Sequence, residues 1–203
     1  GLNVTAVPMA AQTWLKTADL SQYDGIVLAF GSPSIERSFS RALKVRELDL
    51  PVVFTWLEAL DLGGHSLLMW TKGEGCLNCA YRDDEGQPSL APRTAFLEPN
   101  QPVTRNLTGC SGAFVPYGAL QSRRTGLMAA EHILSAMSAV SEGAVARQPS
   151  YKFWVGEGKA AAEQGLRTTP WFRLARTTSE EVATQQVFGR PCTHCRARKE
   201  PAP

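Results

Sequence analysis

Two C-x-x-C pairs constrain the fold of this 203-residue chain more than any other feature of its sequence. The first pair is Cys76 and Cys79, and the second is Cys192 and Cys195. Each pair can turn two sulfurs toward one point, and four thiolates complete the tetrahedral coordination of structural zinc. The roughly 110 residues between the pairs are more than a compact zinc ribbon has. We therefore predict one closed zinc site that joins distant parts of a larger fold; four unliganded thiols, or His194 replacing a cysteine, are the alternatives.

Composition limits the class of protein. Hydrophobic residues make up 43% of the chain and charged residues 20%, as in folded domains, and the formal net charge of +2 gives no indication of nucleic-acid binding. No apolar run reaches the roughly 18 residues of a membrane span, and residues 1–12 do not resemble a signal peptide. Five cysteines, four of them in C-x-x-C pairs, fit metal binding in a reducing compartment. We expect a cytoplasmic protein that binds neither nucleic acid nor membrane.

Hydrophobic patterns in the first part of the chain predict an α/β fold. Residues 24–30 form a continuous apolar run, typical of a strand covered on both faces in a parallel sheet. A helix is predicted from Pro33 or Ser34 to about Leu48, and a strand over 51–56, which together make a parallel strand–helix–strand unit. A third extended segment, 65–70, follows a turn at Gly63-Gly64 and leads into the first cysteine pair. A phosphate-binding role for that turn is a minor alternative.

The second part of the chain predicts a loop, a long helix and a strand pair. Residues 81–109 are polar and rich in proline, which favours a long mobile loop with a solvated acidic turn at 83–85. Residues 117–139 have the longest helical pattern, with an apolar face at Leu120, Leu127, Ala130, Leu134 and Met137. Segment 150–156 alternates in polarity and is predicted as a half-exposed strand, with 171–176 as its partner in an added strand pair, and a helix or strand is predicted over 180–187.

Cys110 is the cysteine that the two pairs leave over, at the end of the polar loop. An inert buried thiol is the simplest interpretation of a lone cysteine. Three features favour a reactive one: the loop suggests exposure, Ser111-Gly112 leaves room for approach, and the following helix start lowers a thiol pKa. Arg105, Arg123 or Arg124 could hold a thiolate, whereas His65 and His132 could reach Cys110 only through folding.

The order of these parts resembles the C-terminal half of the ThiF/MoeB/HesA adenylyltransferases, the bacterial relatives of ubiquitin-activating enzymes. The resemblance covers residues 20–140 and 188–196, and the segments that carry it are PVVFTWLEALDLGGHSLL, GCLNCAYRDDEG and TGCSGAFVPYGALQSRRTGLMAAEHIL. The last two are similar to activating domains of bacterial CBASS-type antiphage operons, which implies a role in antiviral defence. The resemblance to the family implies a Rossmann-like, mostly parallel sheet over residues 1–196, a crossover loop at 80–112, an insert at 150–187 and a disordered tail at 197–203.

The resemblance also implies a reaction. Cys76, Cys79, Cys192 and Cys195 match the family's zinc ligands, and Cys110 matches the cysteine that accepts an activated C-terminal glycine as a thioester. ATP and Mg²⁺ would first adenylate the C-terminus of a ubiquitin-like protein substrate, and the Cys110 thiolate would then displace AMP. Further implied partners are a conjugating domain or protein and a second copy of the chain in a homodimer.

The chain departs from the family pattern in two places. The family's nucleotide-binding first half has no counterpart in this sequence, and Gly31 stands where many members have a magnesium-binding aspartate. Glu36 could substitute for that aspartate, and Gly31 and Ser32 are weak candidates for nucleotide contacts. The alternatives to an activating enzyme are a non-catalytic zinc-stabilised module for protein binding or dimerisation, sulfur-carrier activation in cofactor biosynthesis and, ranked lowest, cysteine-dependent redox chemistry.

Overall fold

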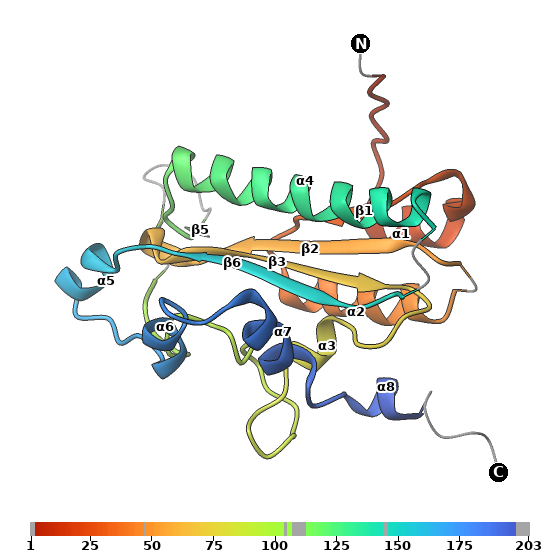
Figure 1. Ribbon diagram of the computed structural model, residues 1–203. Helices are drawn as coiled ribbons and strands as arrows, with labels where there is room; N and C mark the ends of the chain where they lie inside the picture. The colour runs from red at the N-terminus through yellow and green to blue at the C-terminus, as the bar shows by residue number, and fades with distance from the viewer. Residues whose placement is uncertain (1–2, 47, 104, 107–112, 144–145, 198–203) are drawn as a thin grey trace.

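The computed structural model describes residues 3–46, 48–103, 105–106, 113–143 and 146–197. One long helix, α4, lies along one side of a sheet, and α2, α3, α6 and α7 lie on the other side (Figure 1). In chain order the elements are α1 (Ala11–Thr17), η1 (Leu20–Gln22), β1 (Ile26–Leu28), α2 (Pro33–Lys44), β2 (Pro51–Leu57), η2 (Ala59–Asp61), β3 (Gly63–Trp70), α3 (Leu77–Ala80), β4 (Arg105–Asn106), β5 (Ala113–Phe114), α4 (Ala119–Ser141), β6 (Ser150–Val155), α5 (Lys159–Glu163), α6 (Pro170–Leu174), α7 (Glu180–Phe188) and α8 (Thr193–Ala197).

Within the described ranges the main sheet has four strands in the order β1-β2-β3-β6. β1 and β2 are parallel and are joined by α2, so the predicted strand–helix–strand unit is confirmed. β3 is antiparallel to both β2 and β6, so the expectation of a Rossmann-like, mostly parallel sheet is wrong. The physical reason is the connection: only residues 58–62 join β2 to β3, whereas a parallel pair needs a crossover of about a dozen residues.

The sheet buries side chains on both faces. On the face toward α2 and α3, Phe54 and Leu67 pack with Phe39 and Leu43 of α2. On the other face a smaller cluster joins the sheet to α4, and its buried members are Val53, Leu68, Trp70, Ala129, Ile133 and Ala136. Val27 of β1 pairs with Val53 yet is 48% exposed, because α4 packs mainly on β2 and β3. The prediction that the first strand is covered on both faces is therefore wrong.

The long helix α4 confirms the predicted helix but presents a different face to the sheet. Leu120, Leu127 and Leu134, which we expected to face the core, are exposed. Smaller or polar residues face the sheet instead, namely Thr125, Ala129, His132, Ile133 and Ala136. None of the helices in the described ranges combines the length and the apolar character that crossing a bilayer requires.

The predicted strand at 171–176 is a helix. These residues belong to α6 and the turn after it. At the start of the helix the side chain of Thr169 accepts a hydrogen bond from Phe172 N, and Pro170 occupies the first helical position. The expected strand pair is therefore wrong: β6 pairs with β3 in the main sheet instead. The segment at 180–187, for which helix and strand were both open, forms the helix α7.

The described part of the expected mobile loop is packed against the rest of the protein. Phe96 is fully buried and its ring contacts His65 and Phe172. Arg93 Nη1 donates a hydrogen bond to the carbonyl of Gln186, 3.1 Å away. The acidic turn at 83–85 is exposed, as predicted.

Candidate metal centre

The four paired cysteines come together in one buried cluster, as the sequence predicts. Their Sγ atoms all lie within 4.8 Å of one another, and the cluster contains no histidine. Individual Sγ–Sγ distances are 3.6 Å for Cys76–Cys192, 3.7 Å for Cys79–Cys195 and 4.0 Å for Cys76–Cys79. Zinc–sulfur bonds of about 2.3 Å in a tetrahedron separate sulfurs by about 3.8 Å. The four side chains could therefore hold a metal ion such as zinc.

The first cysteine pair lies on a short helical turn. Cys76 precedes α3, and Cys79 N donates a hydrogen bond to Cys76 O over 2.9 Å, which closes the turn and aims both sulfurs the same way. Gly75 has a φ of +68°, and a Cβ there would lie 2.6 Å from Phe188 Cδ1 of α7. Glycine thus provides both the backbone conformation and the space that let α7 approach α3.

A second layer of contacts fixes the orientation of α3. Ser40 Oγ of α2 accepts a hydrogen bond from Leu77 N over 3.1 Å. Arg37 Nε donates to Asn78 Oδ1 over 3.2 Å, and Asn78 Nδ2 donates back to the carbonyl of Arg37 over 3.3 Å. On the other side of the cluster, Cys192 N donates to Cys79 Sγ over 3.4 Å. Such outer contacts orient ligands before a metal binds.

The electrostatics of four crowded thiols favour a bound cation. Hydrogen bonding with Cys192 raises the pKa of the Cys76 thiol and of the Cys195 thiol, whereas hydrogen bonds with Cys195 and then Cys76 lower the pKa of the Cys192 thiol. Buried sulfurs this close cannot all ionise without a compensating positive charge. A divalent metal supplies that charge, and the closed set of four ligands leaves no open position for a substrate. The chemistry of the donor set therefore fits a structural role.

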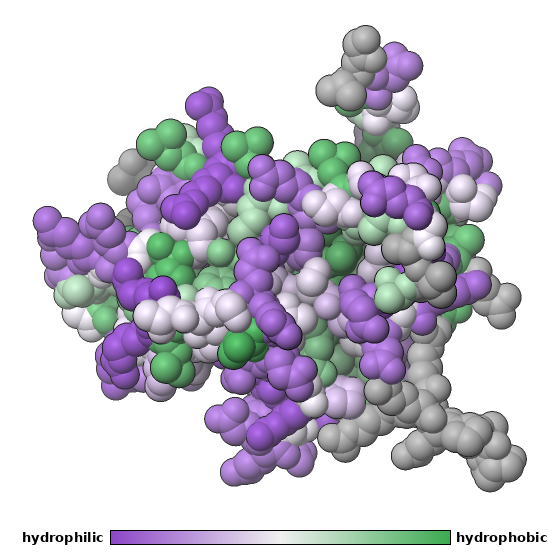
Figure 2. All heavy atoms as spheres, viewed as in Figure 1, coloured by the Kyte–Doolittle hydropathy of each residue, from purple (hydrophilic) through white to green (hydrophobic). Residues whose placement is uncertain are grey.

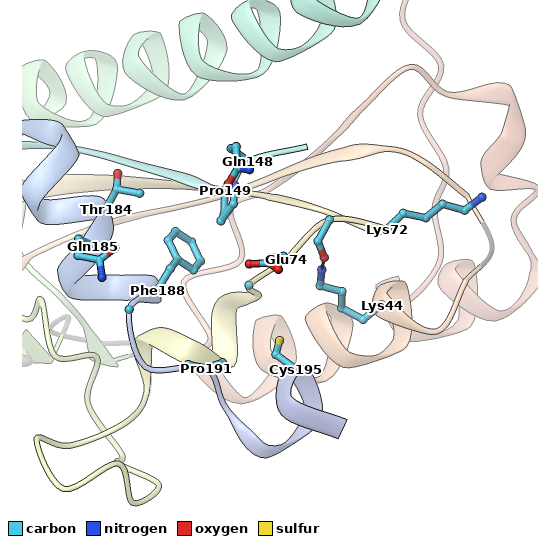
Figure 3. A pocket seen from close by; sticks show the side chains of 13 residues that line it. Lys44, Lys72, Glu74, Gln148, Pro149, Thr184, Gln185, Phe188, Pro191 and Cys195 are labelled. Atoms are coloured by element: carbon cyan, nitrogen blue, oxygen red, sulfur yellow. Dashed lines mark hydrogen bonds between the residues drawn. The ribbon is translucent and has the colours of Figure 1, made fainter. Parts of the chain in front are cut away.

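A hollow of about 650 Å³ lies beside the cluster, with Cys195 at one edge (Figure 3). Phe188 of α7 and Pro149 line the wall opposite Glu74 and Lys44. Lys44 is buried, and its Nζ donates to the carbonyls of Trp70, 2.7 Å away, and Gly73, 2.5 Å away. This ammonium group connects α2 to the end of β3, so its protons are directed at the backbone.

A different part of the molecule contains the candidate nucleotide contacts. Gly31 and Ser32 follow β1, where Gly31 has a φ of +64° and open space around it. Glu36 Oε1 accepts hydrogen bonds from Phe30 N at 3.0 Å and Gly31 N at 3.1 Å. Burial raises the pKa of Glu36 to about 7, against the opposing effect of those two hydrogen bonds. Glu36 therefore closes the turn between β1 and α2 through these two hydrogen bonds.

Cys110 lies outside the described residues, so its predicted role is not tested. β4 and β5, the described strands before and after Cys110 in the sequence, pair antiparallel. Of the basic residues proposed to assist it, Arg124 lies over the ring of Trp154, 4.6 Å from the ring centroid. His65 and His132 are both buried, and each is hydrogen-bonded on both ring nitrogens.

Sequence patterns missed a buried polar network around His65. Its Nδ1 lies 2.5 Å from Tyr151 Oη, and its Nε2 lies 3.1 Å from Glu58 Oε1. The ring also stacks on Trp56, and Glu58 Oε1 accepts a hydrogen bond from Phe96 N. Trp56 comes from β2, Glu58 from the link after it, Tyr151 from β6 and Phe96 from the 81–103 segment, so no local spacing signals the network.

A scan against protein-family models finds no match to this chain, and a search of curated proteins finds no significant match.

Proposed function

We propose that this chain is part of an ATP-dependent adenylyltransferase of the ubiquitin-activating type, in which Cys110 accepts an activated C-terminal carboxyl group. The carboxylate of the protein substrate attacks the α-phosphate of ATP and releases pyrophosphate. The Cys110 thiolate then attacks the acyl carbon of the adenylate, the bond from that carbon to the AMP oxygen breaks, and AMP leaves with the electron pair. The product is a thioester that can pass the substrate to an acceptor.

The observation that carries this proposal is the position of the segment after Cys110. Leu60 N donates to the carbonyl of Pro116 over 2.7 Å, and Gly118 N donates to Asp61 Oδ1 over 2.9 Å. Leu60 and Asp61 lie in η2, directly after the carboxyl end of β2, and both have positive φ angles. In open α/β sheets, ligands bind outside the carboxyl ends of parallel strands. Those contacts therefore hold Pro116 and Gly118, which follow Cys110 by six and eight positions, at the edge where an adenylate would be expected.

The zinc-type cluster supports the proposal in a separate way. It fixes α3 and the chain that enters the 81–103 segment on the α2 side of the sheet. The start of α4 is held by the hydrogen bond from Gly118 N to Asp61 Oδ1, and α4 lies on the opposite side of the sheet (Figure 1). Described residues before and after Cys110 in the sequence are thus held by different elements, and Cys110 is the cysteine that the cluster does not use.

Thioester formation provides the direct test. The chain, supplied with its nucleotide-binding portion if that is encoded separately, is incubated with Mg-ATP and a ubiquitin-like protein that ends in glycine. We expect an adduct that dithiothreitol removes, its absence in Cys110→Ala, and a thiol-resistant, base-labile ester in Cys110→Ser. ATP–pyrophosphate exchange should persist in both variants, because adenylation precedes the cysteine step. An unchanged thioester in Cys110→Ala contradicts the assignment.

A second candidate is a non-catalytic zinc-stabilised binding module, and one observation favours it. Gly31 stands at the position of the family aspartate, and Glu36 Oε1 accepts hydrogen bonds from two backbone amides. Calorimetric titration with Mg-ATP separates the two functions. Absence of both nucleotide binding and pyrophosphate exchange in the complete protein supports the module.

A further inference from the structure

The four cysteines of the cluster differ in how firmly the fold holds them. Cys76 and Cys79 are fully buried at α3, which is fixed through its hydrogen bonds with α2. Cys192 N donates to Cys79 Sγ, which attaches the second pair to the first. Cys195 lies in the short helix α8, and in the part of the chain that the structure describes the hydrogen bonds from α8 to other elements all involve its thiol. Displacement of Cys195 therefore disturbs the fold least.

Cys195 is also the cysteine that reaches the hollow beside the cluster. Its side chain is 7% exposed and lines the hollow, which none of the other three cysteines of the cluster does. In Figure 3 this side chain points from α8 toward the space between Phe188 and Glu74. In Figure 2 hydrophobic side chains are visible between hydrophilic ones in the region between α7 and α8, where the hollow lies. An incoming molecule can thus approach the cluster from the side of Cys195.

The size and the charge of the hollow select a class of molecule. Its volume of about 650 Å³ is within the roughly 300–1,000 Å³ of small-molecule sites. Lys44, Lys72 and Glu74 line it, so positive charges outnumber negative ones. Such a lining disfavours a bare divalent cation and favours an anion. A small aminocarboxylate, whose amine and carboxylates bind zinc and which stays anionic when zinc is bound, fits both properties.

We propose that the hollow is the site where a small anionic chelator exchanges zinc with the cluster, and that Cys195 is the first ligand to leave. A donor atom of the chelator forms a bond to the metal ion, the bond from the ion to Cys195 Sγ breaks, and the released thiolate takes a proton from water. The other three cysteines retain the ion until further donor atoms of the chelator replace them. The proposal rests on zinc binding by the cluster and not on chemistry at Cys110.

The kinetics of zinc transfer provide the first test. Zinc-loaded full-length chain is mixed with nitrilotriacetate, and metal left on the protein is measured over time. The rate should rise with chelator concentration, because the chelator takes part in the exchange. Iminodiacetate attached to a large dextran should act at least tenfold more slowly than free iminodiacetate, since the polymer cannot enter the hollow. A rate equal to that of global unfolding and independent of the chelator, or a chain that holds no zinc, overturns the proposal.

Substitutions at the rim test the location. Gln185 of α7 is exposed and lines the hollow, so Gln185→Trp should slow transfer to nitrilotriacetate at least fivefold. Val182→Trp is the matched control, because Val182 is exposed on the same helix and does not line the hollow. Lys72→Glu should slow transfer to nitrilotriacetate at least threefold and leave transfer to the neutral chelator 1,10-phenanthroline unchanged. Zinc content before mixing verifies that each variant folds. Equal rates for the two tryptophan variants contradict the proposed site.

Alkylation during the exchange identifies the ligand that leaves first. In a Cys110→Ser background, iodoacetamide is added with a limiting amount of nitrilotriacetate, and the modified peptides are followed by mass spectrometry. Cys195 should be alkylated before the other three cysteines, and Gln185→Trp should delay that modification. Simultaneous alkylation of all four cysteines, or earlier modification of Cys76, would show that zinc leaves by another route.

Discussion

The Sγ atoms of Cys76 and Cys192 lie 3.6 Å apart although 116 positions of sequence separate the two residues. The contact joins the turn after β3 to the segment after α7, and Phe188 of α7 packs beside Gly75 at the same place. A metal that binds here stabilises the folded state without entering the centre of the sheet.

Loss of one ligand should remove the metal. We expect Cys192→Ser to lose bound zinc and to lower the free energy of unfolding by about 4 kcal/mol or more, the contribution of a ligand present at a thousandfold excess over its Kd. Metal analysis and urea denaturation measure the two effects. Cys110→Ser is the control and should keep one metal per chain. Full occupancy in Cys192→Ser would exclude the four-thiolate site.

Two glycines should respond to alanine in opposite directions. A Cβ at Gly64 would lie 2.1 Å from Thr125 Oγ1 and 2.5 Å from Trp154 Nε1, two atoms that are hydrogen-bonded to each other. Gly64→Ala should therefore destabilise the protein by about 3 kcal/mol. Gly126 lies on α4 with nothing within 4 Å of such a Cβ, so Gly126→Ala should stabilise by up to about 1 kcal/mol. Urea denaturation compares both with wild type, and a destabilised Gly126→Ala would contradict the open space.

Glu36 should make stability fall as pH rises. Burial raises its pKa from 4.5 to about 7, so the folded state binds a proton that the unfolded state releases between these values. The slope of unfolding free energy with pH is then negative from about 4.5 to 7, and the cost above pH 7 is about 3 kcal/mol. Glu36→Gln keeps an acceptor for the two backbone amides and should remove this loss. Equal pH slopes for wild type and Glu36→Gln would contradict the prediction.

His132 should act in the opposite direction. Burial, assisted by the charge of Lys152, lowers its pKa from 6.5 to about 4, and its nitrogens lie 2.8 Å from Ser66 Oγ and 2.7 Å from Ser150 Oγ. The unfolded state binds the proton first, so stability is lost as pH falls from 6.5 to 4. Between about 4.5 and 6.5 the effects of His132 and Glu36 oppose each other, and Glu36→Gln should therefore expose a rise in stability with pH. A titration of the His132 ring near 6.5, followed by NMR, would exclude this account.

Local sequence signals predicted the features that depend on neighbours in the chain. The C-x-x-C spacing predicted the cysteine cluster, and the order of apolar runs predicted β1, α2 and β2. The predicted strand at 171–176 is wrong because Thr169 and Pro170 provide a helix start signal for α6, and the residues after them do not alternate in polarity. The short link at 58–62 indicates that β2 and β3 are antiparallel, because it is too short for a parallel crossover. The resemblance to a family with a parallel sheet favoured the opposite orientation.

Features that depend on distant partners could not be predicted in this way. The face of α4 that meets the sheet is decided by how close the helix lies to Gly64 and Trp154, which hydrophobic periodicity does not report. The buried Lys44 and the His65–Tyr151 pair combine residues from different strands and helices. In each case the hydrogen-bonding partner in the fold, rather than the residue type, explains why a polar side chain is buried.

The separation of the two cysteine pairs has a consequence for synthesis of the protein. Chains emerge from the ribosome with the N-terminal part first, and contacts between distant segments form only after the intervening chain has been ordered. Every strand of the main sheet precedes Cys192 in the sequence. The sheet can therefore assemble on the nascent chain before the second pair of thiols is made, and capture of a metal by the four cysteines would be one of the last steps of maturation.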